Sequence, residues 1–317
     1  MNPTFLIVGA TGNTGRSVVE TLSEFIPNNG EFSKHRIIAL TRSAQTPTAR
    51  ALAQLPAVEV CEQNWVEITS DWLKQRNVVR AFIAPHLEPT QFAEESTFHL
   101  NALNAGVKYV VRISTGATNV RPDCRTYYGR QHWAVETLLS SREFEDLHWT
   151  SLQPNAFGPT YLFSAVHYIS SYQRGSKQEP LRLMASKDEP VGIIDPDDIG
   201  RLAAHLLLEK DTKPYNRGKY TISGPEDISG KQIVDMVEER IGTKVEQVHY
   251  KDMSFVQQMA EASVHSTNVI MSIQYALETT WEGKCTASTT SQEVLDLAAP
   301  KGTPRQMFEA LLSAQRS

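Results

Sequence analysis

The sequence predicts an α/β protein with a doubly wound parallel sheet, followed by a smaller α+β lobe. In the first half of the chain, short apolar runs alternate with longer amphipathic stretches. Continuous apolar runs are typical of strands buried on both faces, and the stretches between them are long enough to cross over as helices. After about residue 155 the alternation loosens, and helices mix with shorter strands. We therefore expect a first domain over residues 1–155, to which later strands return, and a smaller lobe over residues 156–317.

The expected elements of the first half alternate between strand and helix. In chain order, beginning with a strand, they are TFLIVG, GRSVVETLSEFI, HRIIALT, TARALAQL, VEVCEQ, SDWLKQ, VVRAFIAP, EESTFHLNALNAG, VKYVVRIST, YGRQHWAVETLLSS and HWTSLQPNAF. In the second half, Ser229 is expected to cap a helix whose apolar face carries Ile233, Val234 and Val237.

The composition narrows the classes of partner and compartment. Over 317 residues the net charge is −5 and the isoelectric point is near 6.0, without a Lys/Arg run that could follow a nucleic-acid backbone. We expect no direct nucleic-acid partner. The N-terminal apolar run is too short for a signal segment or a membrane span, so we expect a cytoplasmic protein. The spacing of Cys61, Cys124 and Cys285 favours reduced thiols over disulfides or a metal site.

A glycine-rich loop, VGATGNTG, ends the first strand and opens the first helix. Such glycines permit a tight turn, a close approach of the backbone to a pyrophosphate, and close packing of helix on strand. The helix N-terminus adds amide donors and positive partial charge. The alternative is a glycine turn that binds nothing. The strand and helix on either side favour a Rossmann-type dinucleotide site, formed by Gly9, Thr11, Gly12, Asn13, Thr14 and Gly15.

The end of the second strand, HRIIALTRS, indicates which dinucleotide binds. NAD-binding proteins normally have Asp or Glu here, which holds the ribose hydroxyls. This strand ends in Thr41 and Arg42, without a carboxylate that would repel a 2′-phosphate. A guanidinium suits a phosphate because its planar fork of donors matches the phosphate oxygens. We expect NADP(H) as the cofactor; the alternative is that Arg42 is only a solvated charge.

The motifs IVGATGNTG, ALTRS, VVRISTGAT, HWAVETLL and VGIIDPDDIG together resemble the NmrA-like branch of the atypical short-chain dehydrogenases/reductases. The resemblance covers roughly Phe5 to Tyr250 and is strongest in the first third. It implies the fold and the cofactor. That family includes NADP(H)-sensing partners of transcription regulators, bacterial NADPH quinone reductases, plant isoflavone-type reductases and fungal oxidoreductases of aromatic polyketide pathways. Since enzymes and sensors share the scaffold, the resemblance leaves the activity open.

The resemblance also implies further cofactor contacts. The segment after the fourth strand, AFIAPHLEP, would form a wall beside the cofactor ribose through Ala84, Pro85 and His86. His86 could equally be a loop histidine. Where relatives often have an acidic residue near the adenine, this chain has Asn64, which could still hydrogen-bond the adenine.

The stretch TYYGRQHWAVE carries the candidate catalytic pair. In the wider superfamily, a serine at the end of the fifth strand polarises the substrate carbonyl, a tyrosine delivers a proton, and a lysine four residues later holds the nicotinamide ribose. This sequence has Ser114, Tyr128 and His132 in that order, with Glu136 one helical turn further. Positions four apart share a helix face, so the spacing permits a site. We expect Ser114 and His132 to contact the cofactor too; the alternative for Tyr128 is a surface aromatic.

The stretch LQPNAFGPTYL resembles the turn by which the family enters its substrate pocket. We expect Asn155 to reach the cofactor, and Phe157 and Tyr161 to line the pocket, with Tyr168 and Tyr172 further along. An aromatic wall suits a flat apolar substrate, although plain core is the alternative. The aspartates of IIDPDDIG are interpreted as a turn and a helix cap, so no metal is assigned.

The predicted function is an NADPH-dependent oxidoreductase that transfers hydride to a quinone, enone or aromatic, polyketide-like carbonyl, in secondary metabolism. One alternative is a non-catalytic NADP(H)-sensing regulator that binds a protein partner; another is a dehydratase or isomerase on the same scaffold. A pocket filled by Trp133 or Tyr127 would favour the sensor. The expected partner is a small apolar aromatic substrate, and a homodimer or a protein partner is left open.

Overall fold

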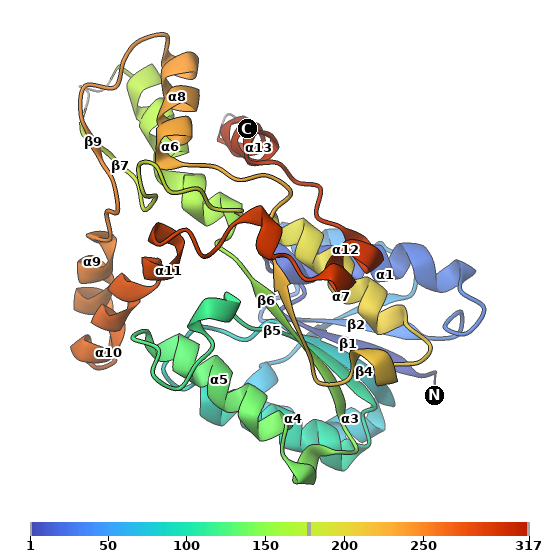
Figure 1. The fold of residues 1–317 in the computed structure, drawn as a ribbon. Helices are drawn as coiled ribbons and strands as arrows, with labels where there is room; N and C mark the ends of the chain where they lie inside the picture. The colour runs from blue at the N-terminus through green and yellow to red at the C-terminus, as the bar shows by residue number, and fades with distance from the viewer. Residues whose placement is uncertain (1, 176–178, 316–317) are drawn as a thin grey trace.

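The computed structural model describes residues 2–175 and 179–315 and contains the predicted doubly wound parallel sheet (Figure 1). Seven strands lie in the order β3-β2-β1-β4-β5-β6-β8, and each neighbouring pair is parallel. Their bounds are β1 Thr4–Val8, β2 Arg36–Thr41, β3 Val58–Glu62, β4 Val78–Ile83, β5 Tyr109–Ile113, β6 His148–Pro154 and β8 Gly218–Ile222. The strand order reverses between β1 and β4, so a ligand crevice is expected at their carboxyl ends.

Helices cover both faces of this sheet (Figure 1). One face carries α1 Asn13–Phe25, α2 Pro47–Leu52, α7 Pro196–Leu208 and α12 Gln292–Ala298, and the other carries α3 Ser70–Gln75, α4 Gln91–Ala105 and α5 Tyr127–Leu139. Alternate strand residues serve the two layers, since Phe5 and Ile7 pack towards α1 whereas Leu6 and Val8 pack towards α4. Two buried faces explain why the strand sequences are continuously apolar.

The chain crosses back to the sheet after the first half. β8 forms the edge of the sheet beside β6. Helices α7 and α12 pack with α1 and complete the helical layer on that face of the sheet. The sheet domain therefore draws on residues well beyond 155. Short 3-10 turns connect several elements: η1 Ile26–Asn28, η2 Trp65–Glu67, η3 Ala117–Asn119, η4 Arg142–Phe144, η5 Lys213–Tyr215, η6 Ser272–Tyr275 and η7 Ala287–Thr289.

A second hydrophobic core forms the smaller lobe. It contains α6 Gly158–Gln173, α8 Gly230–Ile241, α13 Pro304–Ala314 and the parallel pair β7 Leu181–Arg182 and β9 Val248–His249. The predicted helix start is confirmed, because Ser229 and Gln232 form a capping box at the first turn of α8. Ile233, Val234 and Val237 are buried, as expected for its apolar face.

Residues 254–290, here called the cap segment, cross from the lobe to the beginning of α5. They include α9 Phe255–Ala262, α10 Thr267–Met271 and α11 Glu278–Trp281. Figure 1 shows α10 beside the N-terminal end of α5. The contact is specific: the Tyr127 N–H donates to Ser272 Oγ at 3.1 Å, and Asn119 Nδ2 donates to the Ala276 carbonyl at 3.0 Å. Across the described ranges, none of the helices combines the length and apolar character needed to cross a lipid bilayer.

Candidate active site

The glycine loop lies at the carboxyl end of β1 and has little space to spare. Gly9 adopts φ +80°, a backbone conformation that favours glycine. The Gly12 N–H donates to the Gly9 carbonyl oxygen at 3.0 Å, which closes the turn. A Cβ atom on Gly15 would lie 2.1 Å from that same oxygen, so a side chain there requires the loop to open. Gly12 itself is exposed, and its backbone is accessible to a ligand.

The N-terminus of α1 follows directly from this loop. Its N-cap is Gly12, so no side chain accepts from the first-turn amides. Free first-turn amides and the helix dipole favour an anion such as a pyrophosphate. The opposite helix, α7, holds α1 in place: Ser17 Oγ donates to the Asp197 carbonyl at 2.9 Å, and a Cβ on Gly200 would lie 2.6 Å from the Thr14 carbonyl oxygen.

The end of β2 reaches the same loop. Thr11 Oγ1 and Thr41 Oγ1 lie 3.3 Å apart, so these hydroxyls connect the glycine loop to the second strand. Arg42 is exposed, and no other described residue hydrogen-bonds or ion-pairs with it. A neighbouring strand adds a carboxylate that the sequence analysis did not anticipate: Glu62, opposite Thr41 in the sheet, accepts from the Ala44 N–H at 2.8 Å.

The predicted ribose wall lies beside the loop, but its histidine is occupied. The Ala84 N–H donates to the Val8 carbonyl at 3.3 Å, and the Ala84 carbonyl faces Gly9. Pro85 is half-buried next to it. His86 instead accepts from the Glu88 N–H through Nδ1, and its Nε2 contacts the Glu94 carboxylate. These contacts agree with the alternative interpretation of His86 as a loop histidine.

Asn64 stands at the N-cap of η2, with an exposed side chain that caps nothing. Its side chain can contact a ligand at the carboxyl end of β3. Its neighbour Trp65 packs against the His86 ring, with ring centroids 5.4 Å apart. The adenine contact expected of Asn64 therefore stays a prediction.

The structure separates the members of the expected catalytic pair. Tyr128 is half-buried against Tyr127 and residues of α9 and α10, so its ring belongs to the cluster beneath the cap segment. Burial raises the pKa of the Tyr128 hydroxyl well above its ordinary value, helped by the nearby Cys124 thiol and opposed by a hydrogen bond with Thr126. This environment disfavours the tyrosinate form.

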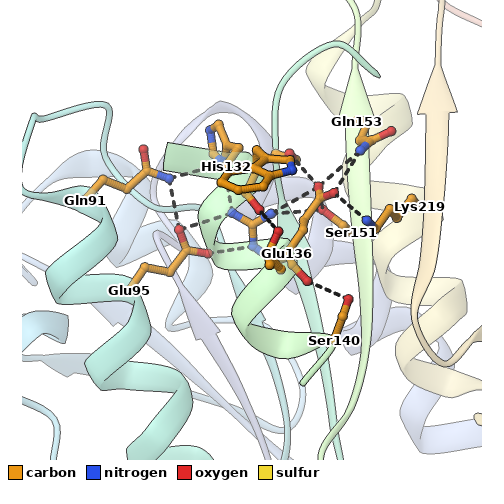
Figure 2. A network of polar contacts seen from close by, with 12 residues as sticks. Gln91, Glu95, His132, Glu136, Ser140, Ser151, Gln153 and Lys219 are labelled. Carbon is orange, nitrogen blue, oxygen red and sulfur yellow. Dashed lines mark hydrogen bonds and ion pairs between the residues drawn. The ribbon is translucent and has the colours of Figure 1, made fainter. Parts of the chain in front are cut away.

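His132 instead enters a fully buried polar network between α4, α5 and β5 (Figure 2). Arg112 Nη2 donates to His132 Nδ1 at 2.8 Å, and Gln91 Nε2 contacts the same nitrogen at 3.2 Å. Arg112 also holds the Glu95 carboxylate, through Nε at 2.7 Å and Nη2 at 3.2 Å. His99 lies 3.4 Å from that carboxylate. The Arg112 and Glu95 charges are paired in a region without solvent, where an unpaired charge would cost folding free energy.

A second carboxylate, Glu136, continues the network towards β6 and β8 (Figure 2). It accepts from Ser114 Oγ at 2.9 Å and from Ser151 Oγ at 2.6 Å. Gln153 Nε2 donates to it at 3.1 Å, and Lys219 Nζ lies 3.4 Å away. The Ser114 hydroxyl proton is therefore committed to a carboxylate. This corrects the expectation that Ser114 is a free donor for a substrate carbonyl.

Desolvation decides the charge of His132. Burial, with a smaller contribution from the Arg112 cation, lowers the pKa of His132 to about 3, although Glu95 opposes the shift. The imidazole is therefore neutral near pH 7, which disfavours His132 as a catalytic acid. Its Nε2 is buried, and no described residue provides a partner. A hydrogen bond from a ligand group to this buried nitrogen would therefore be favourable.

The expected pocket residues have largely structural contacts. Asn155 Nδ2 donates to the Cys285 carbonyl at 2.6 Å and to the Gly192 carbonyl at 3.1 Å, and its Oδ1 accepts from the Ala156 N–H. Since both amide protons are used, Asn155 fastens the cap segment to β6 instead of presenting donors to a cofactor. Phe157 is half-buried and packs on the sheet core.

The tyrosines of α6 belong to the core of the lobe, which is the plain alternative for this stripe. Tyr161 is 2 % exposed and Tyr168 is 9 % exposed. Burial raises the pKa of both hydroxyls. Tyr172 is half-buried near the end of α6. Tyr161 lies near Cys285, which connects this core with the cap segment.

An open crevice lies between η3 and the cap segment. Its volume is about 370 Å³, and it is lined by Thr118, Arg121, Glu278, Thr279, Glu282 and Lys284. It lies where η3 meets α11, since Thr118 Oγ1 donates to Thr279 Oγ1 at 3.0 Å. Asp195, predicted as a cap, accepts from the Asp197 N–H at 2.9 Å and begins α7. Among the described residues, no cluster of His, Cys, Asp and Glu has a metal-binding arrangement.

The sequence analysis missed the network because its members are individually ordinary. One signal was available: Arg112 interrupts the apolar run KYVVRIST, in a strand predicted to be buried on both faces. A buried arginine requires an acid. Glu95 and His99, four residues apart on one predicted helix, would have been the candidates for a partner element.

A glycine loop at the switch point of a doubly wound sheet, with a free helix N-terminus beside it, defines the class of Rossmann dinucleotide-binding folds. The chain belongs to the NmrA-like family, whose model matches residues 1–295. No curated protein matches the chain significantly in sequence.

Solved structures share the fold at low identity. The NADPH-dependent quinone oxidoreductase QOR2 of Escherichia coli, in complex with NADPH, is 18 % identical with a TM-score of 0.70, over 99 % of this chain and 100 % of that one. The Citrobacter sp. triphenylmethane reductase, in complex with NADP(H), is 18 % identical with a TM-score of 0.70, over 98 % and 100 %. A Staphylococcus aureus nucleoside-diphosphate-sugar epimerase is 15 % identical with a TM-score of 0.65, over 98 % and 100 %.

Proposed function

We propose that this protein is an NADPH-dependent oxidoreductase that reduces a quinone, an enone or an aromatic, polyketide-like carbonyl. The observation that carries the proposal is the glycine loop, where a Cβ on Gly15 would meet the Gly9 carbonyl at 2.1 Å and no side chain caps the first-turn amides of α1. Such a loop fits a pyrophosphate. Reductases of quinones and of triphenylmethane dyes, crystallised with NADPH or NADP(H), share this fold.

Arg42 supports the choice of NADPH over NADH. It is an exposed guanidinium at the end of β2, and no described residue neutralises it. Glu62 lies nearby, but its carboxylate already accepts from the Ala44 N–H. A ribose 2′-phosphate beside Arg42 would gain a charge-assisted contact that a ribose hydroxyl would not. Asn64, at the same edge, would be placed for the adenine.

The chain's own residues would bind and orient the nucleotide. The amides after Gly12 would hold the pyrophosphate, Ala84 and Pro85 would border the ribose, and His132 Nε2–H would donate to a ribose hydroxyl. The nicotinamide supplies the hydride when bound. Neither Ser114 nor His132 offers a free acid, since Ser114 donates to Glu136 and the pKa of His132 is lowered to about 3. A quinone suits this arrangement because aromatisation drives its reduction with little general-acid help.

The glycine loop together with the engaged Ser114 and neutral His132 also favours a second candidate, a non-catalytic NADP(H)-sensing protein. A site without a free acid is also what a sensor requires. The pocket-filling side chains do not favour the sensor in the same way: Trp133 is 37 % exposed on α5, and Tyr127 is buried beneath the cap segment. A cytoplasmic location, a place in secondary metabolism, and a homodimer or protein partner remain parts of the proposal.

Two measurements test it. Titration of wild type with NADPH and NADH should give tighter NADPH binding, and Arg42→Ala should weaken NADPH by roughly 10- to 100-fold, the equivalent of about 1.5–3 kcal/mol for a charged hydrogen bond. Arg50→Ala is the matched control, because Arg50 is an exposed arginine nearby that bonds Gln45. Equal affinity for both nucleotides would contradict the assignment. NADPH oxidation with a quinone and aromatic-ketone panel then separates enzyme from sensor.

A further inference from the structure

The hydrogen bonds at His132 determine which of its ring nitrogens carries the proton. Arg112 Nη2 lies 2.8 Å from Nδ1, and a guanidinium has donors only. The Gln91 amide nitrogen, 3.2 Å from Nδ1, also donates to Glu95 Oε2 at 2.9 Å, so this amide is oriented by a carboxylate. Nδ1 must therefore offer a lone pair to both donors. The single proton of the neutral ring is then on Nε2.

Arg112 is itself held rigidly, which makes this assignment durable. Its guanidinium forms two hydrogen bonds to Glu95 of α4, and Nη1 donates to Ser151 Oγ of β6 at 2.9 Å. Arg112, Glu95 and Ser151 are each 0 % exposed. Two elements, α4 and β6, thus fix the guanidinium, and the remaining hydrogen bond of Nη2 is directed at His132.

We propose that Arg112 is a positioning residue that holds His132 as a neutral imidazole with its Nε2–H available to a bound ligand hydroxyl. Nε2 is buried, and no described residue accepts from it, although a buried donor without a partner costs about 1–3 kcal/mol. The missing acceptor is a ligand oxygen, and the ribose hydroxyl at the nicotinamide end is the candidate. Naming the ribose rests on the proposed function; the tautomer does not.

The charged groups around His132 make this donor independent of pH. Arg112 faces it from β5, and Glu95 faces it from α4. His99, also on α4, contacts the Glu95 carboxylate. On its own helix, Tyr128 lies one turn before it and Glu136 one turn after. Where relatives of the wider superfamily place a lysine cation, this chain would present an uncharged donor across the physiological range. The site would hold a ribose without adding a positive charge beneath the nicotinamide.

The tautomer can be measured on the full chain without nucleotide. In protein labelled with ¹⁵N-histidine, the two ring nitrogens give separate shifts, and His132→Gln identifies the signal. We expect an Nε2–H ring that does not titrate between about pH 5 and 8, whereas an unperturbed histidine titrates near 6.5. Arg112→Lys keeps the charge but cannot reach Glu95 and His132 together, so mixed tautomers should appear. Arg80→Lys is the matched control, because Arg80 donates from β4 to carbonyls of Leu207 and Glu209.

Several results would overturn the proposal. An Nδ1–H ring in wild type, protonation of His132 above pH 5, or an unchanged signature in Arg112→Lys would each do so. If Arg112→Lys does not fold, the wild-type spectrum alone decides. NADPH should bind Arg112→Lys about 5-fold more weakly, the equivalent of one net hydrogen bond, and unchanged affinity would remove the ligand role. If NADPH does not bind wild type at all, the proposed function fails while the tautomer assignment stands.

Discussion

Acid should destabilise this protein through histidines that cannot be protonated in the folded state. His132 and His99 are both inaccessible to solvent, at 1 % and 0 % exposed, and burial lowers the pKa of each. An unfolded histidine takes up a proton near pH 6.5, whereas folded His132 resists it down to about pH 3. The unfolded state therefore binds more protons between these values. Stability is present above about pH 6.5 and is lost as the pH falls.

The size of the effect follows from the two pKa values of His132. Between pH 7 and pH 5, a shift from 6.5 to about 3 removes about 2 kcal/mol of unfolding free energy. His99 adds to the loss in the same direction. Native domains are stable by only about 5–15 kcal/mol, so the loss is a measurable fraction of the total. Urea titrations at pH 7 and pH 5, followed by circular dichroism, measure it.

A matched pair of substitutions assigns the loss to the buried ring. His132→Gln keeps an acceptor for Arg112 but cannot take up a proton, so its stability should fall by about 2 kcal/mol less than that of wild type between the two pH values. His167→Gln is the control, because His167 is exposed on α6. Parallel pH dependence in wild type and His132→Gln would refute the reasoning.

Three further predictions concern the glycine loop, Tyr128 beneath the cap segment, and the hydrogen bonds of Asn155. Gly15→Ala should disturb folding as well as nucleotide binding, because its Cβ would lie 2.1 Å from the Gly9 oxygen, whereas Gly12→Val at the exposed position should abolish binding and leave circular dichroism unchanged. Tyr128→Phe should alter turnover by less than about threefold, and a loss of 10²-fold or more would show that its hydroxyl is a general acid after all. Asn155→Ala removes hydrogen bonds to the Cys285 and Gly192 carbonyls, each of which keeps a backbone N–H partner, and should cost about 1–3 kcal/mol in urea unfolding; near-wild-type stability would count against a structural role for Asn155.

The sequence was sufficient for the sheet because periodicity reports burial. The stretches FLIV of β1 and IIAL of β2 are apolar at every position, as expected of a strand covered on both faces, and both lie in interior strands of the sheet. The glycine loop was equally legible, because Gly9 and Gly15 are demanded by backbone geometry within a few residues. Local rules act over short distances along the chain, so one sequence reveals them.

The contacts around His132 could not be predicted from the sequence in this way. The spacing of Tyr128 and His132 is helical, but it does not state which neighbours each side chain meets. Tyr128 packs against the cap segment, from more than a hundred residues later, and His132 meets Arg112 and Glu95. Whether a histidine is a cation or a neutral donor depends on these tertiary neighbours, so sequence spacing alone could not decide it.

The pairing of α1 with α7 also determines when the nucleotide loop can mature during synthesis. Ser17 donates to the Asp197 carbonyl, and Gly200 lies against the first turn of α1, so the helix behind the loop is supported by a much later part of the chain. A ribosome adds roughly 5–20 residues per second, so α1 leaves the exit tunnel roughly ten seconds or more before its partner helix. During that interval its apolar face has no cover. We expect nascent chains that stop before α7 to be captured by chaperones and not by the nucleotide, and the loop to become competent only when the second half has emerged.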